Sequence, residues 1–124
     1  MKAIQSHKDL NVWQRSVDFT VRIYSMTVQF PREELYGLSG QMRRASVSIA
    51  SNIAEGFGRT NKEFGRFLLM ALGSSAELET QIEIATRIGY ISEVESTSLS
   101  TELTIIGKQL TSLRQSVLKK ANNL

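Results

Sequence analysis

Three basic side chains surround the predicted start of a helix in the middle of the chain. Thr60 and Glu63 form a T-x-x-E pattern, whose side chains accept hydrogen bonds from free backbone N–H groups at a helix start. Arg59, Lys62 and Arg66 lie around this start, where cations oppose the helix dipole. Free backbone N–H groups beside arginine and lysine are suited to bind phosphate. This corner is therefore a candidate contact for a nucleic-acid backbone.

Other basic residues could extend this contact. Arg43 and Arg44 precede the corner, and the last predicted helix carries further lysines and an arginine. Lys119 also suits the helix dipole near a C-terminus, which is an alternative reason for its presence. The complete set of predicted nucleic-acid-binding residues is Arg43, Arg44, Arg59, Lys62, Arg66, Lys108, Arg114 and Lys119.

The charges are unevenly spread along a chain whose net charge is only +3. Residues 1–66 carry ten basic and six acidic side chains, residues 67–104 carry six glutamates and one arginine, and residues 105–124 carry four basic side chains. This separation allows an electropositive face, which favours polyanion partners. Two alternatives remain open: solvated helix faces without a partner, and salt bridges from the corner to the acidic residues 77–95 of a neighbouring subunit.

A polar stripe leads into the corner. Ser48, Asn52, Glu55 and Arg59 follow helical spacing, and Glu55 can form an ion pair with Arg59 one turn later. Asn52 can form hydrogen bonds with a neighbouring helix or with the backbone of the corner. We interpret the stripe as a polar network that holds the helices in register, with a small-ligand site as the alternative.

Few residues of this chain could support catalysis or bind a metal. The chain has no cysteine, and its one histidine, His7, precedes the first predicted helix, so a di-iron or haem site is not expected. Activation of a serine as a nucleophile requires a base within hydrogen-bond reach, and the sequence gives no indication of such a base. Glu79 and Glu83 are interpreted as part of a solvated acidic face. We therefore expect no catalytic residue, no metal and no cofactor, and a protein that is not an enzyme.

Helical periodicity appears in four segments, and no segment alternates convincingly with the period of a strand. The 124 residues suit a single domain, 1–124, with helices over about 9–29, 39–57, 60–88 and 92–121. Helix N-caps are expected at Asp9, Ser39, Thr60 and Ser92. The short loops and the apolar repeat in the last two helices predict an all-α, antiparallel up-down four-helix bundle.

More apolar side chains are present than one bundle needs to bury. The first helix has one stripe that contains Trp13 and Val21 and another that contains Phe19 and Ile23, and the third helix adds apolar side chains beside its seam. Surplus apolar surface usually marks an interface, so we expect a homo-oligomer. The predicted interface residues are Phe19, Ile23, Met26, Phe67 and Met70, with Gly65, Gly73 and Ala76 small enough for close backbone approach.

The sequence also indicates the cellular compartment in which we expect the protein. The longest apolar block falls far short of the ~20 residues that span a bilayer. The first residues lack the apolar run of a signal peptide, and a chain without cysteine suits a reducing compartment. We expect a cytoplasmic protein that has no membrane partner.

Three stretches of the chain resemble one bacterial protein family. They are DLNVWQRSVDF at 9–19, FPREELYGLSGQMRRASVSIASNIAEGFGR at 30–59 and EFGRFLLMALGSSAELETQIEIATRIGYI at 63–91. These motifs are similar to those of the four-helix-bundle family named for reading frames in intervening sequences of 23S ribosomal RNA genes. The resemblance implies a small, non-enzymatic bundle that assembles into a ring, in known relatives a pentamer. Residues on the family's motifs are Arg43, Arg44, Asn52, Glu55, Gly56 and Arg59.

The family is also similar to the accessory protein of diversity-generating retroelements, a basic pentameric barrel that works with a reverse transcriptase and RNA. This relation implies nucleic acid as a partner. The leading expectation is therefore a homo-oligomeric, pentameric bundle that associates with RNA or another nucleic acid. The alternative is a scaffold for a protein partner, in which the charges serve only subunit contacts.

Overall fold

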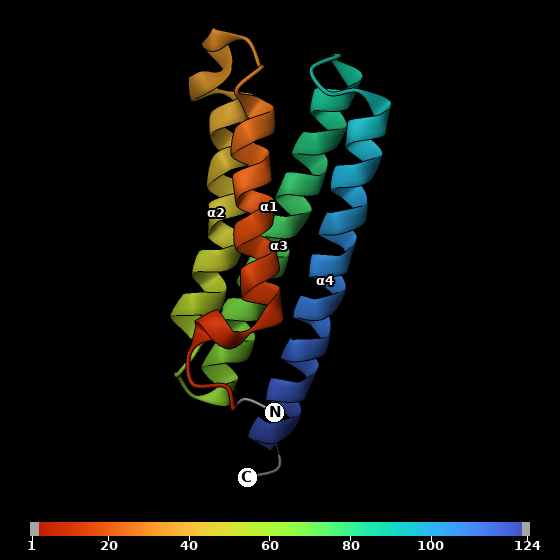
Figure 1. The fold of residues 1–124 in the computed structure, drawn as a ribbon. Coiled ribbons are helices and arrows are strands. Elements are labelled where there is room, and N and C mark those ends of the chain that lie inside the picture. Colours follow the sequence, from red (N-terminus) through yellow and green to blue (C-terminus); the bar gives the residue numbers. More distant parts are fainter. Residues whose placement is uncertain (1–2, 123–124) are drawn as a thin grey trace.

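The computed structural model describes residues 3–122 and shows helices and no strand over this range. Its α-helices are α1 (Asn11–Thr27), α2 (Leu38–Gly56), α3 (Asn61–Arg87) and α4 (Glu93–Asn122) (Figure 1). Two short 3-10 helices, η1 (His7–Asp9) and η2 (Arg32–Tyr36), precede α1 and α2. The prediction of an all-α protein with four helices is confirmed. The predicted domain bounds, residues 1 and 124, lie outside the described residues.

Two of the predicted helix N-caps are wrong. The Asp9 carboxylate accepts hydrogen bonds from backbone N–H groups at the start of η1, and α1 begins after Leu10, which has no capping side chain. Ser39 lies inside α2, where its hydroxyl donates a 2.7 Å hydrogen bond to the Glu34 carbonyl. Both errors have one cause, because a 3-10 helix precedes each of these α-helices and its backbone takes up the polar side chain.

The caps predicted for the last two helices are confirmed. Thr60 and Ser92 each accept a hydrogen bond from the backbone N–H three residues later, at 3.2 Å and 3.1 Å. Gly58 and Gly89 precede these caps with φ angles of 87° and 88°, a backbone conformation that glycine adopts without steric cost. The chain can therefore leave one helix and enter the next within a few residues.

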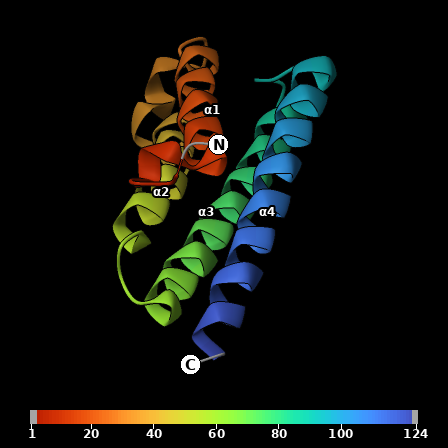
Figure 2. The same cartoon turned by 60° about the horizontal axis from the view of Figure 1, so that its bottom comes forward.

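The helices pack side by side in a fixed register. Ser48 Oγ of α2 lies 2.8 Å from Ser74 Oγ of α3, and Gly56 of α2 packs against Phe67 of α3, so these two helices run antiparallel. Figure 2 shows α1 beside α2 and α3 beside α4. Within residues 3–122, the backbone of α1 lies next to those of α2 and α4 and not next to that of α3. The helices α1 and α3 therefore lie diagonally across the molecule, and their outer sides point in opposite directions.

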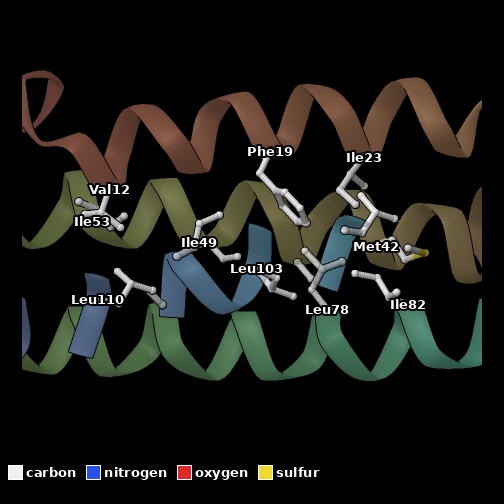
Figure 3. Close-up of a cluster of buried hydrophobic side chains, with 14 of the residues drawn as sticks. Val12, Phe19, Ile23, Met42, Ile49, Ile53, Leu78, Ile82, Leu103 and Leu110 are labelled. Carbon is white, nitrogen blue, oxygen red and sulfur yellow. The ribbon is translucent and has the colours of Figure 1, made fainter. Parts of the chain in front are cut away.

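One apolar core joins the four helices. Its buried side chains include the ten that are labelled in Figure 3, which are Val12, Phe19, Ile23, Met42, Ile49, Ile53, Leu78, Ile82, Leu103 and Leu110. Phe19 and Ile23 are 2% and 0% exposed. The prediction that these two residues form an exposed oligomer interface is therefore wrong, because they fill the core of their own subunit.

The remaining apolar stripe of α1 is the outer one. Trp13 is only partly buried, Tyr24 is 43% exposed and Val21 is 60% exposed. Helical periodicity alone does not show which of the two stripes of α1 is buried. The positions of α2 and α4 around α1 decide which stripe faces the core. No described helix has the length and the apolar character needed to cross a membrane.

Candidate nucleic-acid interface

The corner between α2 and α3 lies beside the last turns of α4. The Arg114 side chain on α4 donates a 3.0 Å hydrogen bond from Nε to the Gly65 carbonyl, near the start of α3. Leu118 covers Gly65 so closely that a Cβ at this position would lie 2.6 Å from Leu118 Cδ2. Glycine at position 65 therefore permits the close approach of the two helices, which brings residues 59–66 next to residues 114–122.

This contact collects basic side chains from distant parts of the sequence at one end of the molecule, the lower end in Figure 1. A surface depression of about 670 Å³ lies between the corner and α4, and Arg59, Lys62, Leu118 and Asn122 are among its lining residues. Lys62, Arg66 and Lys119 are exposed, and Arg114 is half-buried. We call this surface the basic end and define it as Lys8, Arg59, Lys62, Arg66, Arg114, Lys119 and Lys120.

At the corner, two guanidinium groups share one aromatic ring. The Cζ atoms of Arg59 and Arg66 lie 4.9 Å and 5.4 Å from the centroid of the Phe67 ring. Arg59 also donates a 2.7 Å hydrogen bond from Nε to the Glu55 carbonyl, and its Nη1 lies 3.8 Å from a Glu63 carboxylate oxygen. The Phe67 ring therefore orients two cationic side chains at the corner, and the Glu55 carbonyl holds one of them in addition.

Lys8 is a member of the basic end that the sequence did not indicate. The His7 ring packs against Trp13, with 5.1 Å between centroids, and its centroid lies 6.5 Å from that of Phe57. These contacts place η1 beside the end of α2. The sequence contains no direct signal for Lys8, because η1 precedes the first periodic segment and its position depends on aromatic contacts to α1 and α2.

Three of the predicted binding residues lie away from the basic end. Arg43 is near the start of α2, where it donates a 3.0 Å hydrogen bond to Thr27 Oγ1 and lies over the Tyr24 ring. Arg44 follows it on the outer side of α2, and Lys108 lines a depression between the middle parts of α3 and α4. The predicted set therefore does not form one surface, and the contacts of Arg43 are those of a structural residue.

The comparisons with known proteins assign a family. A family model described as 23S rRNA-intervening sequence protein matches residues 8–112. The chain belongs to this family. This confirms the resemblance that the motifs indicated. A solved structure of a protein of unknown function from the S23 ribosomal protein family, from Bacteroides thetaiotaomicron, is similar, with 28% identity and a TM-score of 0.77 over 84% of this chain and 95% of that one. The search of curated proteins found no match.

The polar stripe lies within the range that matches the 23S rRNA-intervening sequence protein family. Asn52 is 8% exposed and donates from Nδ2 to the Ser48 carbonyl at 2.8 Å and to Ser48 Oγ at 3.0 Å. Ser48 in turn contacts Ser74, which links α2 to α3. Ser48 therefore makes the contact between helices. The hydrogen bonds of Asn52 stay within α2, so the prediction that they reach a neighbouring helix or the corner is wrong.

The other half of the stripe differs from the prediction. Arg59 bonds to the backbone carbonyl of Glu55, and the carboxylate nearest to it is that of Glu63. The predicted ion pair between the Glu55 carboxylate and Arg59 is therefore wrong. The helix ends at Gly56, so residue 59 no longer follows the helical spacing on which the prediction depended. The stripe consists of two separate groups of contacts.

Two groups with perturbed pKa values lie away from the basic end. The Glu102 carboxylate raises the pKa of Arg15, first through a 2.6 Å hydrogen bond and then through its charge, and this pair links α1 to α4. A hydrogen bond to Glu34 raises the pKa of Tyr90. Among the described residues, no three histidine, cysteine, aspartate or glutamate side chains are placed to hold a metal.

The remaining predicted interface residues differ in exposure. Met26 is partly buried against the core, and Phe67 is half-buried where it packs on Gly56. Met70 is 47% exposed on the outer side of α3. Of the five predicted residues, Met70 is therefore the most available for contact with another molecule.

Proposed function

We propose that this protein binds RNA or another nucleic acid through its basic end and acts in the cytoplasm as a non-enzymatic homo-oligomer. The observation that supports this proposal is the convergence of the α2–α3 corner with the last turns of α4, which the Arg114 contact to Gly65 holds in place. Basic side chains from three separate segments meet there. Such a concentration of positive charge favours a polyanion.

The contacts that we propose are made to phosphate groups. Lys62 and Lys119 are exposed and long enough to reach a strand that passes over the end of the molecule. Arg59 is held by the Phe67 ring and the Glu55 carbonyl, so it loses little side-chain entropy on binding. Contacts to phosphate carry no sequence information. The expected binding is therefore weakly selective for base sequence.

The proposed unit of assembly is the antiparallel up-down bundle, and the proposed assembly is a ring of five copies. Exposed apolar side chains on α1 and α3, among them Val21 and Met70, support self-association. A ring would repeat the basic end once per copy. Several weak phosphate contacts would then act on one strand, which raises the overall affinity.

Salt-dependent binding to RNA tests the proposal. The probe is a fluorescently labelled single-stranded RNA of mixed sequence, and the measurement is its anisotropy at a series of salt concentrations. We expect log affinity to fall linearly with log salt, with a slope of about −0.7 for each phosphate neutralised. A protein that leaves the anisotropy unchanged at the lowest salt concentration would end the proposal.

A scaffold for a protein partner is the second candidate function. The specific observation in its favour is an apolar depression of about 350 Å³ between α1 and α2, lined by Trp13, Val17, Val21 and Val47 among others. Co-purification of one protein at a fixed ratio, together with the absence of RNA binding, would favour this function over the first.

A further inference from the structure

The outer side of α1 and the adjacent part of α2 form an apolar groove. Trp13, Val17, Val21 and Tyr24 face outward along α1, and Val47 lies next to them on α2. Val21, Tyr24 and Val47 are 60%, 43% and 41% exposed. The depression of about 350 Å³ lies between them. We call this surface the α1–α2 groove. Contiguous apolar surface of this kind is typical of an interface.

The outer side of α3 carries a narrower apolar surface. Leu69 and Met70 are 51% and 47% exposed, and Gly73 and Ala76 follow within two turns. We call these four residues the α3 outer face. A Cβ on Gly73 would meet no atom within 4 Å, whereas one on Gly56 would lie 2.6 Å from Phe67. Glycine destabilises a helix interior relative to alanine, so the small size of Gly73 suits a contact outside the subunit.

Charged side chains beside these two surfaces have matching separations. On α2, Arg44 and Glu55 are eleven residues apart, which corresponds to three turns and about 16 Å along the helix. On α3, Arg66 and Glu77 are also eleven residues apart. All four side chains are exposed, and the ion pairs within residues 3–122 involve none of them.

The register of α2 against α3 sets the heights of these charges. The Ser48–Ser74 contact places Arg44 at nearly the same height along the molecule as Glu77, because α2 and α3 are antiparallel. The same register places Glu55 at nearly the height of Arg66. A second copy in the same orientation and at the same height would therefore present a charge of opposite sign at both positions.

The apolar surfaces match in this arrangement as well. Thr20 Oγ1 donates a 3.1 Å hydrogen bond to the Ser46 carbonyl, which fixes the height of α1 against α2. Together with the contact between α2 and α3, this bond places Gly73 and Ala76 at the height of residues 17–21. The bulky side chains of one copy would then meet the smallest part of the α3 outer face of the other.

We propose that the α3 helix of a second copy of this chain lies in the α1–α2 groove, with parallel orientation and without a shift along the helix axes. This proposal rests on the self-association proposed above and names its two faces. Because the groove lies between α1 and α2 and the α3 outer face lies on another side of the subunit, each copy contacts one neighbour with its groove and another with its α3 outer face. Such a head-to-tail contact forms a ring where the rotation between neighbouring copies closes, and an open row where it does not.

Two variants, each with one altered face, test this arrangement. Val21→Glu places a charge in the groove, and Gly73→Glu places a charged side chain on the α3 outer face, where the subunit leaves room. Each variant alone is expected to sediment as a monomer. An equimolar mixture is expected to form a one-to-one pair that grows no further, because it contains one intact face of each kind. Thr101→Glu, on the exposed side of α4, is the control and should assemble like the wild type.

The outcomes separate this proposal from the more general one. A wild-type protein that stays monomeric at every concentration overturns self-association itself. A wild type that assembles, with either variant assembling equally well, overturns the choice of faces and leaves self-association in place. A mixture that contains only monomers overturns the head-to-tail contact. Circular dichroism confirms that each variant is folded before its size is interpreted.

Charge exchange tests the relative height of the two copies. Arg44→Glu and Glu77→Arg should each raise the dissociation constant of the assembly about fivefold, which is the effect of one exposed ion pair at the upper end of the usual range. The two changes combined in one chain should restore the wild-type constant. A double variant that is weaker than either single variant overturns the proposed pairing of Arg44 with Glu77.

Discussion

The Tyr90 hydroxyl donates a 3.0 Å hydrogen bond to Glu34 Oε2 and so links the turn between α3 and α4 to the segment before α2. The other oxygen of the same carboxylate, Oε1, accepts a 3.2 Å hydrogen bond from the Leu38 N–H at the start of α2. The Tyr90 ring also packs against Phe30, with 5.0 Å between centroids. Glu34 therefore caps one helix and fixes the connection between two others.

Replacement of Tyr90 by phenylalanine tests this link. The hydrogen bond to Glu34 is the main cause that raises the pKa of Tyr90 above 10.0, and burial and the charges of Glu34 and Glu33 add to it. Because the folded pKa is higher than the unfolded one, the stabilisation is present below pH 10 and is lost as the pH rises through the folded pKa. We expect Tyr90→Phe to unfold at a lower urea concentration than the wild type at pH 7, and the difference to shrink in alkaline buffer.

Tyr36→Phe is the control for this pH dependence, because Tyr36 is 91% exposed. Its urea midpoint should match that of the wild type at both pH values. A midpoint for Tyr90→Phe that equals the wild-type value at pH 7 would contradict the assigned role of the hydrogen bond.

Single charge reversals at the basic end should weaken RNA binding. Lys62→Glu and Lys119→Glu each remove an exposed cation from the proposed surface, so each should lower the affinity and reduce the salt slope by about 0.7. Arg32→Glu makes the same change in net charge on η2, away from the basic end, and should change binding less. An equal loss in all three variants would show that net charge, and not the position of the cations, governs binding.

Asn52→Ala separates the structural role of the polar stripe from a role in binding. The variant removes two hydrogen bonds to Ser48 at a position that is 8% exposed. We expect the free energy of unfolding to fall by about 1–2 kcal/mol. RNA binding by the folded variant should be unchanged. Asn11→Ala, at an exposed position, is the stability control. Unchanged stability with lost RNA binding would instead assign Asn52 to a binding site.

Alanine at two glycine positions should have opposite effects. In Gly56→Ala the new Cβ would lie 2.6 Å from Phe67 Cβ, so we expect a loss of about 1–3 kcal/mol in urea unfolding. In Gly73→Ala the new Cβ meets no atom within 4 Å, so we expect the isolated subunit to gain about 0.5–1 kcal/mol. Unfolding is measured at low protein concentration, where self-association does not contribute. A destabilised Gly73→Ala subunit would contradict the open space around this position.

Local signals in the sequence were sufficient for the helices and for two of their caps. Thr60 and Ser92 act within one turn of the chain, so their patterns predict their roles without knowledge of any neighbour. The same reasoning failed at Asp9 and Ser39, because a preceding 3-10 helix competes for each side chain. The prediction of a Glu55–Arg59 ion pair failed for a related reason, since the helix on which that prediction depended ends at Gly56.

The sequence by itself determined the all-α class, the positions of the turns and the concentration of positive charge at the corner, because each of these depends on residues close together along the chain. Only the tertiary structure decided that Arg114 bonds to the backbone of the corner while Arg43 contacts Thr27. It also decided that Phe19 is buried and Val21 is exposed. The physical reason is that a helical repeat defines faces, whereas the direction in which each face points depends on the neighbouring helices.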